Sequence, residues 1–224
     1  MKKLLLCLIP LLLFCGCSTK TLSEEEKIDI SATIENPMKV SIIKSAMESD
    51  SKLTRAQIIF NRMPENFIDI HSIDRSGEDG KYITAAMLVG SLSLWNPSNP
   101  DNCNIALKSL LNSPTVEKGY TNNTESFVKE RMMQNEKYPY LAKAYFDGAN
   151  KENNYSIGEP ISLTVEEFSK DSEESTIYGT KLNIEKLNFK VNDSIRTVSF
   201  YQDPVDGVWY VWSDSYSSLL ADIQ

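Results

Sequence analysis

Histidine is almost absent from this chain, since His71 is the only one in 224 residues. A metal site built from several histidines is therefore excluded. A serine hydrolase with His71 as its base would need a nucleophile elbow, G-x-S-x-G, and the sequence has none. The glycine-rich patterns of P-loop and dinucleotide-binding proteins are missing too. We therefore predict no catalytic residue, no metal ligand and no cofactor.

Cysteine is scarce as well, and three of the four cysteines fall within the first 17 residues. Once that segment is cut or modified, Cys103 stands alone and no internal disulfide can form. Cys103 and His71 lie in no local signature of a thiol protease. A lone cysteine beside apolar, helix-like residues is typical of a small buried hydrophobe.

Positive charge is in deficit: 23 basic residues face 31 acidic ones, for a formal net charge of −8. Removing Lys2 and Lys3 with the N-terminal segment leaves 21 basic residues and a charge of −10. Nucleic acids are bound by basic surfaces, so we predict no nucleic-acid partner. A polybasic membrane-binding face is also excluded. No apolar run reaches the roughly 20 residues that a transmembrane helix needs.

The first 17 residues have the order of a secretory leader: two lysines, an apolar run from Leu4 to Phe14, and then small residues. Gly16 followed by Cys17 resembles the end of a bacterial lipoprotein signal, although Phe14 stands where an aliphatic residue is usual. The resemblance implies lipidation of Cys17 and anchoring to a membrane on the extracytoplasmic face of the cell envelope. The alternative is an ordinary secretory signal, cleavage of which releases a soluble protein.

For the rest of the chain we predict a polar tether followed by one domain. Residues 1–16 are the leader, residues 17–50 a polar tether with a short helix over 40–47, and residues 51–224 a single domain. No repeat or second linker divides the domain.

The sequence pattern from about residue 54 to residue 146 predicts helices. Thr54 and Gln57 have capping-box spacing before an apolar group, and Pro64 would end that helix. Residues 82–95 are apolar nearly all round, which is typical of a helix buried inside a domain. Further helices are expected from 101 to before 113, over 124–136 and over 141–146.

From about 160 to 213 the hydrophobic period changes to two, which predicts strands. The alternation slips by one residue near Glu185, which predicts a bulge. The loop at 203–207 predicts a final hairpin. Helices followed by strands, without alternation, indicate an α+β fold. We expect an N-terminal helical layer packed on a C-terminal antiparallel sheet of about four to five strands.

Tyrosines gather where the predicted helices meet the predicted sheet: Tyr138, Tyr140, Tyr145 and Tyr155. Aromatic rings with polar tips suit contacts with proteins or carbohydrates, so these four form a candidate binding surface. The interpretation that we favour is that they fill the seam between helices and sheet, because large aromatics dominate cores too.

Several short features occur together in the last 140 or so residues: Tyr145–Ala149, Asn154-Tyr155, Pro160, Trp212 and Leu219–Ile223. As a set they resemble a family of small bacterial proteins that carry a domain of unknown function. The family brings no established activity, so the resemblance implies no catalytic role for any residue.

Two functions remain open. The first is a membrane-anchored lipoprotein with a non-catalytic binding or structural domain, whose partner is a protein or a carbohydrate of the envelope. The second is an exported hydrolase that uses a carboxylate pair. The adjacent acids Glu166-Glu167 and Glu173-Glu174 are typical of solvated strand ends. Two acids converging in one cleft would favour the hydrolase, and aromatics exposed on the sheet would favour the binding domain.

Overall fold

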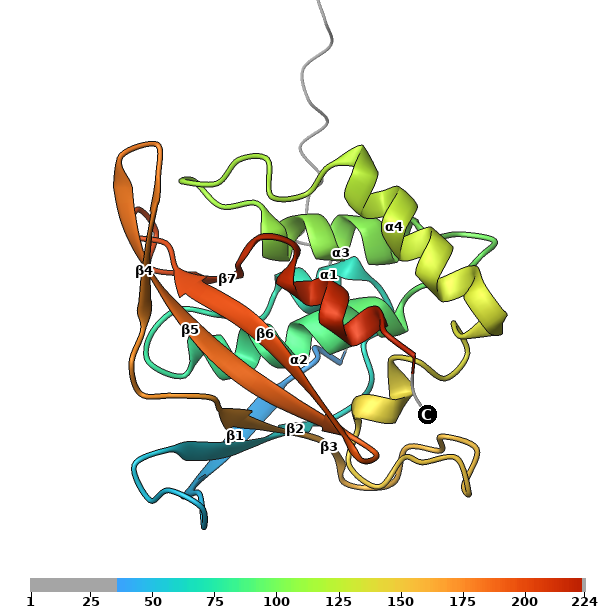
Figure 1. Cartoon of the computed structure of the whole chain (residues 1–224). Coiled ribbons are helices and arrows are strands. Elements are labelled where there is room, and N and C mark those ends of the chain that lie inside the picture. Colours follow the sequence, from blue (N-terminus) through green and yellow to red (C-terminus); the bar gives the residue numbers. More distant parts are fainter. Residues whose placement is uncertain (1–35, 223–224) are drawn as a thin grey trace, which may run out of the picture. The chain divides into compact units, whose positions relative to one another are not determined.

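The computed structural model describes residues 36–222 (Figure 1). The expected leader, Cys17 and most of the expected tether lie outside the described residues. The described strands are β1 (Val40–Ala46), β2 (Thr54–Phe60), β3 (Ile161–Glu167), β4 (Glu173–Ile177), β5 (Thr180–Val191), β6 (Ser194–Gln202) and β7 (Trp209–Val211). The helices are α1 (Phe67–His71), α2 (Gly80–Ser93), α3 (Asp101–Leu111) and α4 (Asn122–Met133), with short 3-10 helices η1 (Gln134–Glu136), η2 (Lys143–Tyr145) and η3 (Ser213–Leu220). None of these helices is long and apolar enough to cross a membrane.

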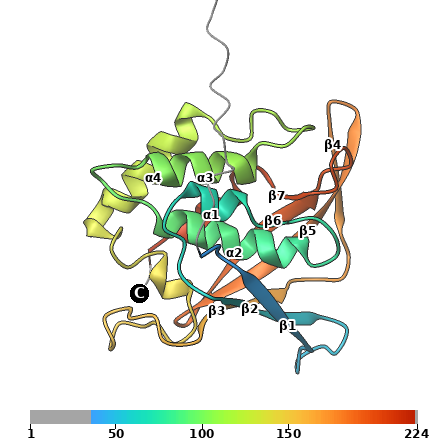
Figure 2. The same ribbon diagram turned by 180° about the vertical axis from the view of Figure 1, so that it is seen from behind.

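The strands form one antiparallel sheet that curls, with the helices against one of its faces (Figures 1 and 2). The strand order is β1-β2-β3-β5-β6-β7, and β4 pairs with the first half of β5. Helices α1 to α4 are inserted in the chain between β2 and β3, which are neighbours in the sheet. The main core lies between this helical insertion and the sheet.

The predicted fold class, an N-terminal helical layer on a C-terminal sheet of four to five strands, is wrong. The sheet has seven strands within residues 36–222, and β1 and β2 precede all the described helices. Residues 54–60, predicted as a helix, bury Ala56, Ile58 and Phe60 at alternate positions. Pairing on both edges, with β1 and β3, satisfies the backbone of β2. The hydrogen bonds of this pairing favour the strand more than the capping-box spacing of Thr54 and Gln57 favours a helix.

Residues 40–46, expected to belong to the tether and to form a short helix, are strand β1. Their register with β2 runs from Val40 opposite Phe60 to Ala46 opposite Thr54. Most side chains of β1 are exposed, as is common for a strand at the edge of a sheet. The folded part therefore begins before residue 51.

Helix α2 is the buried centre of the molecule, as its composition predicted. It packs on β7 and β2 on one side and on α3 on the other. The helix begins at Gly80, where a Cβ atom would lie 2.1 Å from the carbonyl oxygen of Arg75 and 2.4 Å from Cδ1 of Trp209. Only glycine allows so close an approach. Helices α3 and α4 also form near the predicted positions.

The phase change in β5 is not a bulge. The register with β6 is one-to-one from Ile184 opposite Tyr201 to Val191 opposite Ser194. Leu187 and Phe189 face the main core, whereas Leu182 and Ile184 join a second cluster with Tyr201 and Tyr210. Because successive side chains point to opposite faces, a strand that buries first one face and then the other mimics the pattern of a bulge.

Candidate functional site

The face of the sheet turned away from the main core is polar over four neighbouring strands. The register aligns Ser45, Arg55, Glu166 and Asn188 in one row across β1, β2, β3 and β5. A second row holds Ile43, Gln57 and Thr164. These residues alternate along each strand with the buried residues of the core, so the burial of one face leaves them on the other.

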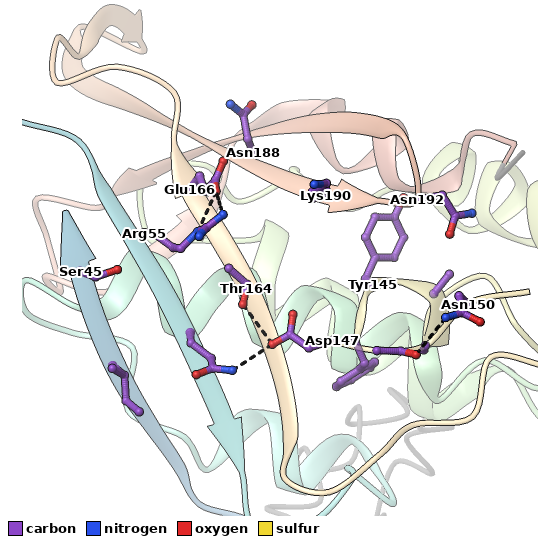
Figure 3. A pocket seen from close by; sticks show the side chains of 16 residues that line it. Ser45, Arg55, Tyr145, Asp147, Asn150, Thr164, Glu166, Asn188, Lys190 and Asn192 are labelled. Carbon is purple, nitrogen blue, oxygen red and sulfur yellow. Dashed lines mark hydrogen bonds and ion pairs between the residues drawn. The ribbon is translucent and has the colours of Figure 1, made fainter. Parts of the chain in front are cut away.

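A cavity of about 600 Å³ lies over the two rows, and we call it the polar groove (Figure 3). Its lining comprises the two rows, Lys190 and Asn192 of the β5–β6 ribbon, and the chain segment 144–150. Within that segment Gly148 has a φ of +80°, a conformation that glycine adopts without steric cost. The volume lies within the range of about 300–1,000 Å³ that is usual for ligand sites.

Asp147 fixes this segment to the sheet. Its Oδ2 accepts hydrogen bonds from Ser162 Oγ at 2.6 Å, Thr164 Oγ1 at 3.0 Å and Gln57 Nε2 at 3.2 Å. The backbone N–H of Asp147 donates to the carbonyl oxygen of Ser162 at 2.8 Å. Figure 3 shows the side chain reaching across to Thr164. The wall and the floor of the groove are thus joined by one carboxylate.

Arg55 and Glu166 form an ion pair on the floor of the groove. Arg55 Nη2 lies 2.6 Å from Glu166 Oε1, and its Nε donates to the same oxygen at 2.8 Å. The Arg55 side chain is 51% exposed and that of Glu166 25%. Exposed pairs of this kind contribute less than about 1 kcal/mol, so an incoming polar group can displace one partner. Lys190 and Asp147 add one further charge of each sign.

The lining of the groove is rich in hydrogen-bonding groups. Within residues 36–222, no group of three or more histidine, cysteine, aspartate or glutamate side chains could hold a metal ion. Amides, hydroxyls and both charge signs are present, which together donate to and accept from a polar ligand.

The adjacent acids Glu166 and Glu167 do not form a pair, because they point to opposite faces of β3. Glu167 is 4% exposed on the helix side and accepts from Lys81 Nζ, Lys170 Nζ and the hydroxyl of Tyr82. Burial alone would raise the pKa of Glu167, but the hydrogen bonds from these partners outweigh it and lower the pKa to about 2. The interpretation of Glu167 as a solvated strand end is wrong.

The acids of β4 are engaged at the surface. Glu173 pairs with Lys186 at 2.5 Å and Glu174 with Lys181 at 3.2 Å, both across β4 and β5. Both glutamate side chains are about two-thirds exposed, as expected for solvated positions.

The four tyrosines proposed as a binding surface make three separate sets of contacts. Tyr145 lines the groove but is buried, and its hydroxyl donates to the carbonyl oxygen of Leu219 at 2.8 Å. Tyr140 and Tyr155 stack on each other with ring centroids 5.1 Å apart. Tyr138 packs on Trp95 at 5.5 Å. Tyr145, Tyr155 and Tyr140 belong to or pack on the main core, as the seam interpretation expects.

Of the groove residues, Tyr145 and Glu166 were singled out from the sequence, whereas Arg55, Gln57 and Asp147 were missed. Arg55 and Gln57 were assigned to a helix, which hid their alternation with Ala56 and Ile58. Asp147 appeared only within a family motif. The usable signal was the period of two over residues 54–60, since it places Arg55 and Gln57 on the face opposite the core.

Cys103 is fully buried, as the sequence predicted, and burial raises the pKa of its thiol. His71 is exposed at the end of α1. A thiol buried in the core in its neutral form is no nucleophile.

Comparison with known proteins places the chain in one family. A family model described as "Domain of unknown function (DUF6935)" matches residues 62–224. No curated protein and no solved structure matches the chain. The match begins just after β2 and includes α1 to α4 and every later strand. By this match, which spans well over half of its length, the chain belongs to the family of proteins with the domain of unknown function DUF6935.

Proposed function

We propose that this protein is a bacterial lipoprotein, anchored through Cys17 to the extracytoplasmic face of the cell envelope, whose folded part binds a partner without catalysis. The leader-like order of the first 17 residues supports the anchor. The polar groove supports the binding role and is the observation on which that role rests.

A lipid anchor suits the composition of the chain. Each buried methylene of an acyl chain contributes about 0.8 kcal/mol, and two chains hold a protein stably on a membrane. The acidic folded part then needs no basic or apolar membrane surface of its own. It is free to present the groove to other components of the envelope.

A protein is the partner that the groove suits best. Its floor carries both charge signs together with amides and hydroxyls, a mixture that matches a polypeptide surface. The groove also runs out to β1, which in the described part of the chain pairs only with β2. The free edge of such a strand can add an extended segment of another chain by backbone hydrogen bonds.

The groove acids favour binding over hydrolysis. Asp147 accepts three hydrogen bonds from its own protein, and Glu166 is paired with Arg55. A glycosidase-type pair needs one acid free to protonate the leaving group and a second to act as base or nucleophile. Both carboxylates here already accept hydrogen bonds from side chains of the protein itself.

Site-specific photo-crosslinking in cells tests the binding role. A photoreactive amino acid at Asn188, on the groove floor, is expected to capture a discrete envelope protein. The same group at Lys129, exposed on α4, is the matched control and should capture nothing specific.

A second pair of variants ties the capture to groove chemistry. Arg55→Ala should reduce capture at Asn188, whereas Arg131→Ala, which removes an arginine from α4, should not. Equal capture from Asn188 and Lys129 contradicts the binding role. Capture of a molecule that wild type cleaves and Asp147→Asn only retains would establish the hydrolase alternative.

A further inference from the structure

A second cavity, of about 550 Å³, lies away from the polar groove, and the two share no lining residue. It is bounded by the loop before α4, the start of α4, the end of β4 and the segment 212–217. Figures 1 and 2 both show the β4–β5 hairpin beside the loop that precedes α4. Three aromatic residues from α4, η3 and the residue before η3 line it: Phe127, Tyr216 and Trp212. We call it the aromatic cavity.

Trp212 is held rigidly at the wall of this cavity. Its backbone N–H donates to the carbonyl oxygen of Ser199 at 2.8 Å, and its own carbonyl oxygen accepts from Ser215 Oγ at 2.7 Å. Its indole meets the buried ring of Tyr201 at 5.6 Å with an interplanar angle of 84°. The next residue, Ser213, has a φ of +50°, which is uncommon for a residue other than glycine.

Buried hydrogen bonds in turn hold the side chain of Tyr201 in place. Its hydroxyl donates to Ser113 Oγ at 2.8 Å, and Ser113 Oγ donates to Asp203 Oδ2 at 2.5 Å. Asp203 is fully buried and also accepts from the backbone N–H groups of Thr115 and Val205. A half-exposed indole supported by a fully satisfied buried network is a preorganised contact surface.

The rim of the aromatic cavity offers neutral hydrogen-bonding groups. Thr121, Asn123, Ser213 and Ser217 supply hydroxyls and an amide, each able to donate and accept. Lys118 and Asp214 contribute one charge of each sign, so the rim carries no net charge. A ligand with an apolar face and a hydroxyl-bearing edge fits this combination of aromatic rings and neutral hydrogen-bonding groups.

We propose that the aromatic cavity binds a neutral saccharide. A pyranose ring presents C–H bonds on its faces and hydroxyls around its edge. The faces pack on Trp212 and Phe127, and the hydroxyls meet the polar rim. A wholly apolar ligand would leave the rim groups without partners, which is costly once water is excluded.

Tryptophan fluorescence reports directly on this site. The chain has three tryptophans; Trp95 and Trp209 are 5% and 6% exposed, and Trp212 is the most accessible. The probes are glucose, galactose, mannose, N-acetylglucosamine and their β-linked disaccharides. Each is added to about 10 mM, which saturates a site with a Kd of about 1 mM. We expect at least one to shift the emission and to protect it from iodide quenching.

Variants assign the signal. Trp212→Phe should abolish the spectral response, since the remaining tryptophans are buried. Phe127→Ala should weaken binding by roughly tenfold or more, as for a central aromatic contact. Phe168→Ala removes an exposed phenylalanine that lines neither cavity and should leave the affinity unchanged.

The outcomes are decisive for this cavity alone. No response to any sugar, a response that survives Trp212→Phe, or an affinity unaffected by Phe127→Ala would each overturn the proposal. If an apolar peptide, added in the same way, shifted the emission and no sugar did, the cavity would be assigned to a protein instead. Arg55→Ala alters only the polar groove and should leave the saccharide response intact, so the two sites can fail independently.

Discussion

The neighbouring residues Glu166 and Glu167 point to opposite faces of β3 and have different partners. Glu166 faces the polar groove with an exposed partner, whereas Glu167 faces the helices and binds Lys81 at 2.7 Å and Lys170 at 2.5 Å. Lys81 also reaches Glu185 of β5 at 2.6 Å. Although burial lowers the pKa of Lys81, the hydrogen bonds that it donates to Glu167 and Glu185 raise the pKa above its ordinary value. This charge cluster joins α2 to two strands.

Glu167→Gln should destabilise the fold by about 3 kcal/mol, because it removes the buried carboxylate that Lys81, Lys170 and Tyr82 share. Glu166→Gln, one residue away on the exposed face, should cost less than about 1 kcal/mol. Urea unfolding of the two variants measures the difference. Equal losses would mean that Glu167 is not part of a buried ionic cluster.

The contribution of Glu167 should depend on pH in the acid range. Its pKa is lowered from 4.5 to about 2 on folding, so the folded state favours the ionised form. The stabilisation is fully present above pH 4.5 and is lost as the pH falls towards 2. The stability gap between wild type and Glu167→Gln should therefore shrink over that window. A gap that stays constant from pH 5 to pH 2.5 would contradict the assignment.

At the scale of elements, β2 contributes both to the core and to the polar groove. It connects the edge strand β1 to β3 and supplies Arg55 and Gln57 to the groove floor. The same alternation places Ala56, Ile58 and Phe60 in the core. A single strand thus couples the stability of the fold to the presentation of the groove.

Alanine substitutions at neighbouring isoleucines test whether residues 54–60 are a strand. Ile58 is fully buried and Ile59 lies half-buried on the opposite face. Ile58→Ala should cost about 2–5 kcal/mol, and Ile59→Ala clearly less, as thermal unfolding can measure. Two equally large losses would fit an apolar helix face better than a strand.

Local patterns predicted the elements whose sequence signal lies within the element itself. Helix α2 is apolar all round, and the β6–β7 hairpin carries its own turn residues, so both were found. Strand β2 was missed because it pairs with β3, which lies more than 100 residues further along the chain, and β1 was missed with it because β1 pairs with β2. The phase change in β5 was misinterpreted because it needed a second cluster on the opposite face.

At the scale of the whole molecule, the curled sheet carries the main core on one face and, on the other, both the polar groove and the smaller hydrophobic cluster. The helical insertion covers one face, and the polar groove occupies part of the other. The groove could not be predicted from sequence, since its rows combine β1, β2, β3 and β5, and their register is a tertiary property. The burial of Cys103, by contrast, followed from its immediate neighbours.

Anchoring through Cys17 is the claim on which both the location and the class of partner depend. Intact-mass analysis of the protein from its native membrane measures it directly, beside Cys17→Ala and, as a matched control, Cys15→Ala. We expect wild type and Cys15→Ala to begin at Cys17 with added acyl mass, and Cys17→Ala to remain uncut or unattached. Cleavage of wild type and Cys17→Ala at the same unmodified site, with release of both, would contradict the account.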